Sequence, residues 1–569
     1  MSQKRHKQER IKEIARKDSG IEYDISIGIR KILGENWIYL AGLLLGIVLL
    51  YMNGMKGDFV SDDYATISQN PQVKDFSYMS KGFFAVTMMN YVIAKVFGVT
   101  SSTPFHLFSL VLYLGTCLAG FVFLTILFKE RVARIAMLIF AVMPVHVEAV
   151  SWISGKPYLM NALMILISMS LFAMYDKTNK KKYLYWFFAS IPIVFWFEMV
   201  RSLSLPFLIM LYLFCFSRDR LRRVNWTTVL PGIAAILTVA ILILWRMIQN
   251  RISTVNSGYN FSESVFYSPF FQYPTAITKY LQLMFVPIDL TLYHTMYVIP
   301  VWLNWVVLTM YVALVIYFLF RKPRIAFVLA YVIFAMVPSM APVKVSWLVA
   351  ERYAFLGSLG FAAFLALILD SVWNKFFMVQ YFLLASIVFL YGARVYLRNI
   401  DWQTNHNLWV NTCQVSPNSH NAWNNIGDDY DKLAQYENAI KGFTQSTIVK
   451  PNYADAFHNR ANIFYKMGRF DLARDSYNTA LSYSPGLFQT YLSLTQIDLA
   501  EMKYDQALEH SKKYLDMQPN DLQAWYVYGV VNAQAGFTKE AEKIFSMILQ
   551  KSPTYKPAKD AMIQLTQQS

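Results

Sequence analysis

Two adjacent carboxylates are the first side chains in the sequence that could do chemistry. Asp62 and Asp63 follow the first long apolar run and precede the turn-forming pair Asn70-Pro71. One carboxylate can take a proton from an attacking hydroxyl group while its neighbour orients the acceptor or helps to hold a cation. A solvated surface loop is the alternative, and for an isolated pair of aspartates it is the better interpretation. A catalytic role therefore needs further polar residues at the same surface.

Further polar residues stand where other apolar runs end. His146 and Glu148 close one run, and Lys156 lies in the turn that follows it. Polar side chains in or beside a membrane span are costly, so each needs a partner, such as a hydrogen bond within the bundle, or a task. Cations gathered with carboxylates suit the anionic head group of a lipid, for which a bidentate arginine is the natural ligand. The other members of this set are Glu198, Arg201, Lys344, Glu351 and Arg352.

A divalent metal is another use for these acids. Asp62, Asp63, His146 and Glu148 could share Mg²⁺ or Mn²⁺ if the fold brings them together. Sites of this oxygen-rich kind have no diagnostic spacing in a sequence. Metal dependence therefore stays open, and no other cofactor is indicated.

The composition indicates what must position these residues. Of 569 residues, 56% are hydrophobic and only 15% are charged, which is too apolar for an ordinary soluble enzyme. The net charge of +16 comes mainly from short loops between apolar runs, which is the positive-inside pattern, so a nucleic-acid partner has no support. Three cysteines in distant regions exclude a disulfide framework. We therefore expect an all-α fold with a polytopic membrane helix bundle.

Basic clusters determine the number of spans. The clusters around Lys129, Arg218 and Arg321 fall on one side of the membrane if the chain crosses it eleven times. Residues 1–36 then form a basic cytoplasmic leader without a cleavable signal, and 37–399 form the transmembrane domain. The predicted spans are 37–52, 105–128, 134–152, 158–175, 183–198, 201–217, 227–245, 298–320, 325–341, 353–373 and 376–396.

The same count places the loops between the spans. The segment 273–290 is apolar enough to be a twelfth span, but a crossing there would move Arg321 and its neighbours to the outer side. We therefore expect an interfacial or re-entrant helix. The loop 54–104, which carries the acid pair, then lies with 246–297, 342–352 and the C-terminal tail on the non-cytoplasmic face.

A strict repeat begins after residue 400. Prolines recur every 34 residues, with alanines and aromatic residues at fixed positions between them, as in the tetratricopeptide repeat (TPR). We expect a connecting segment at 400–419, four TPR units at 420–555 and a capping helix at 556–569. Such an α-solenoid offers a concave surface to an extended peptide or a protein partner. The repeated prolines are Pro417, Pro451, Pro485, Pro519 and Pro553.

The order of the polar motifs along the chain carries a family resemblance. The motifs are Phe59-Val60-Ser61-Asp62-Asp63 with Ile67 and Asn70, Pro144-Val145-His146-Val147-Glu148-Ala149-Val150 with Trp152-Ile153-Ser154-Gly155, Tyr280-Leu281-Gln282-Leu283 with Pro287 and Leu290, and Ala350-Glu351-Arg352-Tyr353. With the TPR array after the last span, the sequence resembles the transmembrane and TPR repeat-containing protein O-mannosyltransferases. These enzymes are members of the GT-C glycosyltransferase superfamily, and the resemblance covers nearly the whole chain.

The resemblance implies an activity and roles for residues. It implies transfer of mannose, with inversion, from a polyprenyl-phosphate carrier to Ser or Thr of an extracytoplasmic protein that the TPR array binds. Asp62 would be the base and Asp63 its support, although the two roles could be exchanged. Arg352, with Lys344 and Arg201, would hold the donor phosphate. Their positive charge would stabilise the phosphate as it leaves. His146, Glu148, Lys156, Glu198 and Glu351 would line the same pocket. The expected location is a prokaryotic cytoplasmic membrane.

The sequence also departs from that family. Phe197 stands where members usually carry the lysine of a Lys-Glu pair, although Arg201 can supply the lost charge, and Tyr158 replaces an acidic residue. Tyr113 stands where a histidine is common, and an Arg-Pro pair expected near Lys81 is absent. These changes weaken the inference of an identical donor and sugar. A non-catalytic TPR scaffold for envelope assembly, or a transferase acting on a glycan or lipid, are the alternative hypotheses.

Overall fold

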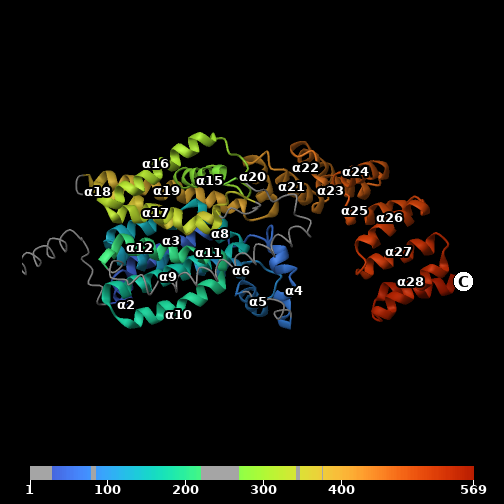
Figure 1. The fold of residues 1–569 in the computed structure, drawn as a ribbon, viewed down its shortest axis with the longest axis horizontal. Coiled ribbons are helices and arrows are strands. Elements are labelled where there is room, and N and C mark those ends of the chain that lie inside the picture. Colours follow the sequence, from blue (N-terminus) through green and yellow to red (C-terminus); the bar gives the residue numbers. More distant parts are fainter. Residues whose placement is uncertain (1–27, 78–84, 220–267, 341–346, 374–375, 569) are drawn as a thin grey trace, which may run out of the picture. The chain divides into compact units, whose positions relative to one another are not determined.

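The computed structural model describes residues 28–77, 85–219, 268–340, 347–373 and 376–568. All regular elements in these ranges are helices, with no β-strand among them, so the all-α prediction is confirmed. The chain divides into two compact units, Met1–Asn411 and Thr412–Ser569. The division falls within the predicted connecting segment 400–419, most of which is helical (Figure 1).

The first unit contains the apolar helices. Six of its described helices are long and apolar enough to cross a membrane, and two bent pairs raise the number to eight. The six are Thr103–Leu127 (α6), Ile153–Thr178 (η5 and α9), Met199–Phe216 (α11 and α12), Val301–Arg321 (α16), Pro323–Met340 (α17 and η7) and Phe377–Asp401 (α19). The pairs are Ile29–Glu35 (α2) with Trp37–Tyr51 (α3), and Glu130–Ala141 (α7) with Pro144–Ser151 (η4 and α8).

These eight candidates correspond to eight of the eleven predicted spans. Two other predicted spans are shorter helices, Lys181–Phe197 (α10) and Ser358–Trp373 (α18), of 17 and 16 residues. Helix α18 begins five residues later than predicted because Glu351–Ala354 (η8) forms a separate 3₁₀ turn. The predicted span 227–245 lies outside the described residues, as do most of the basic leader and Lys344.

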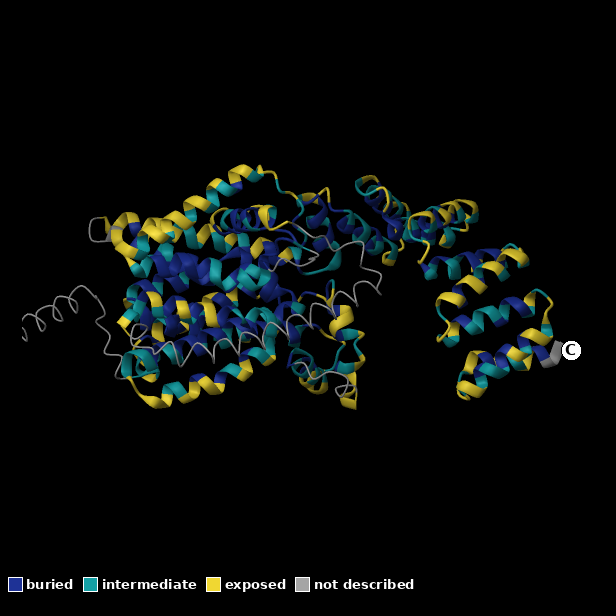
Figure 2. Ribbon diagram, in the orientation of Figure 1, coloured by how far each residue is buried: buried dark blue, intermediate teal, exposed yellow. Residues whose placement is uncertain are grey.

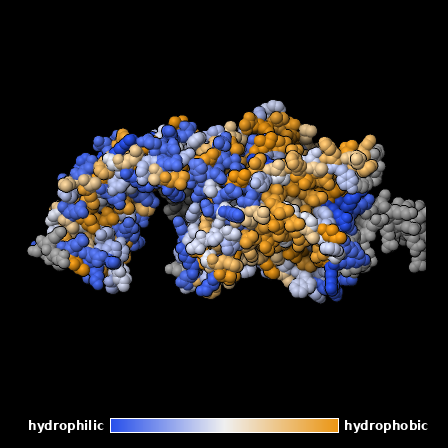
Figure 3. All heavy atoms as spheres, turned by 180° about the vertical axis from the view of Figure 1, so that it is seen from behind, coloured by the Kyte–Doolittle hydropathy of each residue, from blue (hydrophilic) through white to orange (hydrophobic). Residues whose placement is uncertain are grey.

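The surface of this unit matches its apolar composition. Buried residues fill the centre of the bundle in Figure 2, and large apolar residues of α16 and α19 are among the exposed ones. Trp302 and Phe320 of α16 are 68% and 77% exposed, and Phe389 of α19 is 73% exposed. Figure 3 shows a broad hydrophobic surface over the bundle. Such a surface fits the hydrocarbon of a bilayer, where outward apolar side chains are the rule.

Short elements outside the candidate spans surround the polar motifs. The acid pair immediately precedes the π-helical turn Tyr64–Ser68 (η2), which is followed by Pro71–Lys74 (α4) and Ala85–Phe97 (α5). The Asn70 side chain caps α4 by accepting a hydrogen bond from the backbone of Gln72. The segment predicted as an interfacial or re-entrant helix forms Pro269–Phe285 (α15), which is largely buried.

The second unit is a series of paired helices. The helices after Asn405–Val415 (α20) are His420–Lys432 (α21), Tyr436–Val449 (α22), Ala454–Lys466 (α23), Phe470–Tyr483 (α24), Phe488–Ala500 (α25), Tyr504–Met517 (α26), Leu522–Gln534 (α27), Thr538–Lys551 (α28) and Lys556–Gln568 (α29). Small residues let each pair approach closely: a Cβ on Gly529 would lie 2.6 Å from Phe545 Cε1. The indole N–H groups of Trp423 and Trp525 donate to the carbonyls of Pro417 and Pro519, so each tryptophan is tied to the proline that precedes its helix.

Candidate active site

The loop after α3 holds the two aspartates in different environments. Asp63 is fully buried. Its Oδ2 accepts a hydrogen bond from the backbone of Val60 at 3.1 Å, and its Oδ1 accepts from Ser154 N at 2.8 Å and Ser154 Oγ at 2.5 Å. Burial raises the pKa of Asp63 to about 6, although the Ser154 and Val60 hydrogen bonds and the charge of Lys156 oppose the shift. Asp63 therefore anchors the loop to the turn before α9.

Asp62 has the opposite environment. Its side chain is exposed, and the described residues give its carboxylate no hydrogen bond. Only its backbone carbonyl is engaged, by Thr66 N at 2.9 Å and Thr66 Oγ1 at 2.8 Å. Desolvation by the surrounding protein raises the pKa of Asp62, and the positive charge of Arg352 opposes this shift. Asp62 is thus an accessible carboxylate whose pKa is influenced by an arginine, and such a carboxylate can accept a proton from a hydroxyl group within hydrogen-bond reach.

Arg352 reaches the site from η8 and forms a buried ion pair. Its Nη1 donates to Glu148 Oε1, and its backbone N–H donates to Glu148 Oε2 at 2.7 Å. Glu148 is fully buried and Arg352 is 9% exposed. The guanidinium also lies over the rings of Trp152 and Tyr353, at 5.2 and 5.1 Å from their centroids. Helix α8 and the turn η8, about 200 residues apart in sequence, are thereby joined.

Tyr158 connects Arg352 to a second arginine. Its hydroxyl oxygen accepts from Arg352 Nε at 3.1 Å and from Arg201 Nη2 at 2.5 Å. Arg201 also pairs with Glu198, Nη1 to Oε2 at 3.0 Å, and stacks on Tyr158 at 3.9 Å. The structure therefore brings Asp62, Arg352, Glu148, Arg201 and Glu198 into one neighbourhood. The sequence indicated Tyr158 only as a departure from the family pattern and did not identify it as a bridge.

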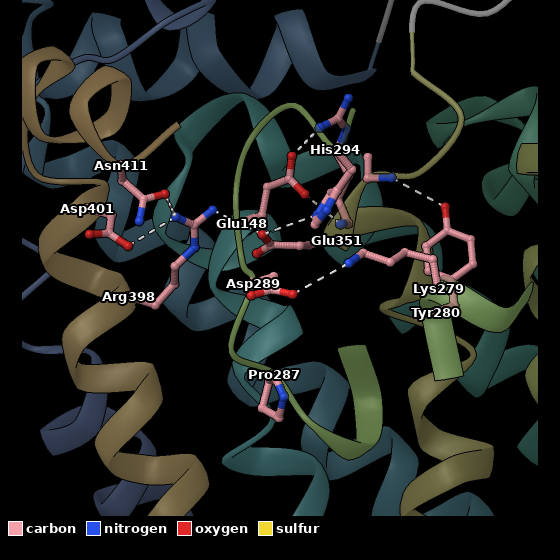
Figure 4. A network of polar contacts seen from close by, with 12 residues as sticks. Glu148, Lys279, Tyr280, Pro287, Asp289, His294, Glu351, Arg398, Asp401 and Asn411 are labelled. Carbon is pink, nitrogen blue, oxygen red and sulfur yellow. Dashed lines mark hydrogen bonds and ion pairs between the residues drawn. The ribbon is translucent and has the colours of Figure 1, made fainter. Parts of the chain in front are cut away.

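Glu351 points to a different network. Its Oε1 accepts from Arg398 Nη2 at 3.1 Å and lies 3.7 Å from His294 Nε2 (Figure 4). Arg398 Nη1 also donates hydrogen bonds to Asp401 Oδ2 at 3.0 Å and to Asn411 Oδ1 at 2.9 Å. Burial alone would raise the pKa of Glu351, but the Arg398 charge, the interaction with His294 and the hydrogen bond from the backbone of Thr291 together outweigh it, and the net shift is downward. Glu351 thus binds the end of α19, whereas Arg352 binds Glu148 and Tyr158.

Lys156 and His146 are packed inside the protein. Lys156 is fully buried beside Asp63, and its Nζ has no hydrogen-bond partner among the described residues. His146 uses both ring nitrogens, with Tyr113 Oη at 2.9 Å and Ser358 Oγ at 2.7 Å. His146 therefore braces the bundle. Tyr113, which the sequence showed only as a substitution for histidine, is its partner.

The structure does not bring the four predicted metal ligands together. Among the described residues, no group of three or more His, Cys, Asp or Glu side chains is placed to hold a metal ion. The side chains of Asp63, His146 and Glu148 are each bonded to a different protein partner. A shared Mg²⁺ or Mn²⁺ on Asp62, Asp63, His146 and Glu148 is therefore not supported by this geometry.

Comparison with known proteins identifies the repeats. Two tetratricopeptide repeat family models match residues 454–487 and 486–556, so the C-terminal region is a TPR array. The crystal structure of MamA protein is 18% identical, with a TM-score of 0.25, over 26% of this chain and 81% of that chain.

The same comparisons find mannosyltransferases among the curated relatives. Human protein O-mannosyl-transferase TMTC3 is 25% identical over 205 residues, which are 32% of this chain and 22% of the relative. Drosophila melanogaster Tmtc3 is 23% identical over 25% of this chain and 16% of its own. Human RNA polymerase II-associated protein 3 is 23% identical over 25% of this chain and 19% of its own. The chain thus spans about a fifth of the length of the curated relatives it matches.

Breaking the Glu148–Arg352 ion pair should lower the stability of the protein strongly. In Glu148→Gln the guanidinium stays buried without its counter-charge, so we expect a loss of about 3–5 kcal/mol in the free energy of unfolding. Equilibrium unfolding in mixed detergent micelles measures it. The matched control Glu509→Gln breaks an exposed pair with Lys513, which contributes little. A Glu148→Gln variant as stable as this control would show that the ion pair is not a structural requirement.

Proposed function

We propose that the protein is a membrane glycosyltransferase of GT-C type that moves mannose from a polyprenyl-phosphate carrier to Ser or Thr of extracytoplasmic proteins. The observation that carries the proposal is the placement of the accessible Asp62 carboxylate near the Arg352 guanidinium. A base and an anion ligand in one neighbourhood are what transfer from a sugar phosphate needs. The names of the curated relatives support mannose as the sugar and protein as the acceptor.

The reaction follows from these two groups. The acceptor hydroxyl oxygen forms a bond to C1 of the sugar, and Asp62 takes the hydroxyl proton. The bond between C1 and the phosphate oxygen breaks, and the polyprenyl phosphate leaves with the electron pair. A single displacement inverts the configuration at C1.

Arg352 has a donor to spare for the phosphate. Glu148 accepts from its Nη1 and Tyr158 from its Nε, while the described residues give its Nη2 no hydrogen bond. Arg201, which donates to the same Tyr158 hydroxyl, is a second positive charge beside Arg352. A guanidinium already oriented by buried partners loses little freedom when it binds an anion, and it stabilises the charge that develops on the leaving phosphate. Lys344, outside the described residues, stays a predicted third ligand.

The topology and the role of the array belong to the same proposal. With a cytoplasmic N-terminus, the acid pair and the TPR array lie on the outer face of a prokaryotic cytoplasmic membrane. The array then binds the acceptor protein, as its TPR units allow.

A non-catalytic TPR scaffold is the second candidate. The buried Glu148–Arg352 pair favours it, because such a pair can simply brace two segments. A scaffold needs no exposed carboxylate at Asp62, so loss of this carboxylate separates the two functions.

The test is transfer of labelled mannose from polyprenyl-phosphate-mannose to envelope proteins by the purified full chain. We expect Asp62→Asn to lower kcat by about 10²–10⁴-fold, the usual contribution of a general base. The control Asp58→Asn changes an exposed carboxylate of the same loop and should leave kcat unchanged. Equal transfer by wild type and Asp62→Asn would contradict the role of Asp62, and no transfer by wild type would favour the scaffold.

The pH dependence of transfer provides an independent prediction. Only ionised Asp62 can accept a proton, so kcat/KM, which reports the groups of the free enzyme, should rise with pH through its pKa. Because that pKa is raised, the rise should lie above the ordinary range of an aspartate. Arg352 lowers this pKa, so Arg352→Gln should move the rise to higher pH. A rise at the ordinary aspartate pKa, or a shift in the opposite direction in Arg352→Gln, would exclude Asp62 as the titrating group.

A further inference from the structure

The segment that follows α19 contacts the loop of the acid pair. Asn405, the first residue of α20, accepts a hydrogen bond from the backbone N–H of Ser61 on its Oδ1, at 2.9 Å. The backbone carbonyl of Gln403 accepts from Asp58 N at 2.8 Å. The Asn405 contact joins positions 344 residues apart in sequence and ends on Ser61, the residue immediately before Asp62.

Ser61 needs such a contact because of its backbone conformation. Its φ is +53°, in the left-handed region that residues other than glycine rarely adopt. Such conformations persist only where the surroundings hold them. The surroundings here are the Asn405 side chain on Ser61 N and the Asp63 carboxylate on Val60 N. The reversal at Ser61 precedes two neighbours with opposite environments, the exposed Asp62 and the buried Asp63.

The supporting segment is itself fixed to the bundle. The Trp402 side chain is 1% exposed and stacks on Trp152, with ring centroids 5.8 Å apart. Amide side chains complete the attachment. Their hydrogen bonds are Asn399 Nδ2 to Leu50 O at 3.1 Å, Ser151 Oγ to Asn399 Oδ1 at 2.8 Å, and Gln403 Nε2 to Asn53 O at 2.8 Å. Asn405 therefore directly follows a segment that stacking and hydrogen bonds attach to the bundle.

We infer that Asn405 is a positioning residue for the reaction: by holding Ser61 in its left-handed conformation, it directs the Asp62 carboxylate toward the acceptor hydroxyl. The effect of Asn405 on catalysis rests on the proposed function, whereas its effect on the conformation of Ser61 does not. Asn405 itself touches no reacting group. Its effect is on the fraction of molecules in which Asp62 is correctly placed, so its loss lowers kcat and leaves the KM for the lipid donor unchanged.

The experiment compares Asn405→Ala with Asn407→Ala in the full chain. Asn407 lies two residues after Asn405 on the same helix, and its side chain hydrogen-bonds Ile400 O at 3.0 Å and, among the described residues, makes no side-chain bond to the loop of the acid pair. We expect Asn405→Ala to lower kcat by about 10- to 100-fold at constant donor KM, as small misplacements of catalytic groups do. Asn405→Asp keeps the Oδ1 acceptor and should retain most of the activity at a pH where Asp62 is ionised. Asn407→Ala should match wild type.

Amide hydrogen exchange gives a readout that does not depend on activity. The peptide covering 57–66 should exchange faster in Asn405→Ala than in wild type or Asn407→Ala, with the unfolding midpoint preserved. Unchanged exchange overturns the inference. So does faster exchange with unchanged kcat in an enzyme that Asp62→Asn inactivates. If wild type transfers no sugar, the proposed function fails by itself, and the exchange result still decides whether Asn405 holds the loop.

Discussion

The buried ion pair between Glu148 and Arg352 is the interaction on which the site depends. A guanidinium inside an apolar bundle is stable only when a counter-charge and hydrogen bonds surround it, and Glu148 supplies both through its two oxygens. This requirement holds η8 against α8 and delays the start of α18 to Ser358. It also sets the charge near Asp62. The arginine that could bind a leaving phosphate is therefore part of the framework that keeps the bundle together.

The two adjacent aspartates have different roles in one loop, one structural and one proposed to be catalytic. Asp63 uses both oxygens to anchor the loop, while Asp62 keeps its carboxylate accessible. The left-handed Ser61 lies immediately before them, and Asn405 holds its N–H from the segment after the last span. A truncation that removes the TPR array while testing transfer should therefore retain the chain through Pro417. A cut at residue 400 would remove Trp402 and Asn405, and would damage the site together with the array.

Periodic features were predictable from the sequence, and contacts between distant segments were not. The 34-residue spacing predicted the TPR helices because each unit repeats the same close packing, as at Gly529 against Phe545. The acid pair was predicted as a unit, but the different burial of its members depends on Ser154, 91 residues away. The sequence predicted Glu351 and Arg352 in one pocket. In the structure both lie in the 3₁₀ turn η8, but Glu351 binds Arg398 and Arg352 binds Glu148. No local signal marked Asn405, whose role appears only beside Ser61.

The most direct test of the account is the structure of the full chain in a lipid nanodisc with polyprenyl phosphate bound. The account predicts the phosphate on Arg352 Nη2, with Glu148 still on Nη1, Arg201 adjacent and the Asp62 carboxylate facing the side of the phosphate where C1 of the sugar would lie. A phosphate bound away from Arg352, or an Asp62 carboxylate turned away from it, would contradict the central claim.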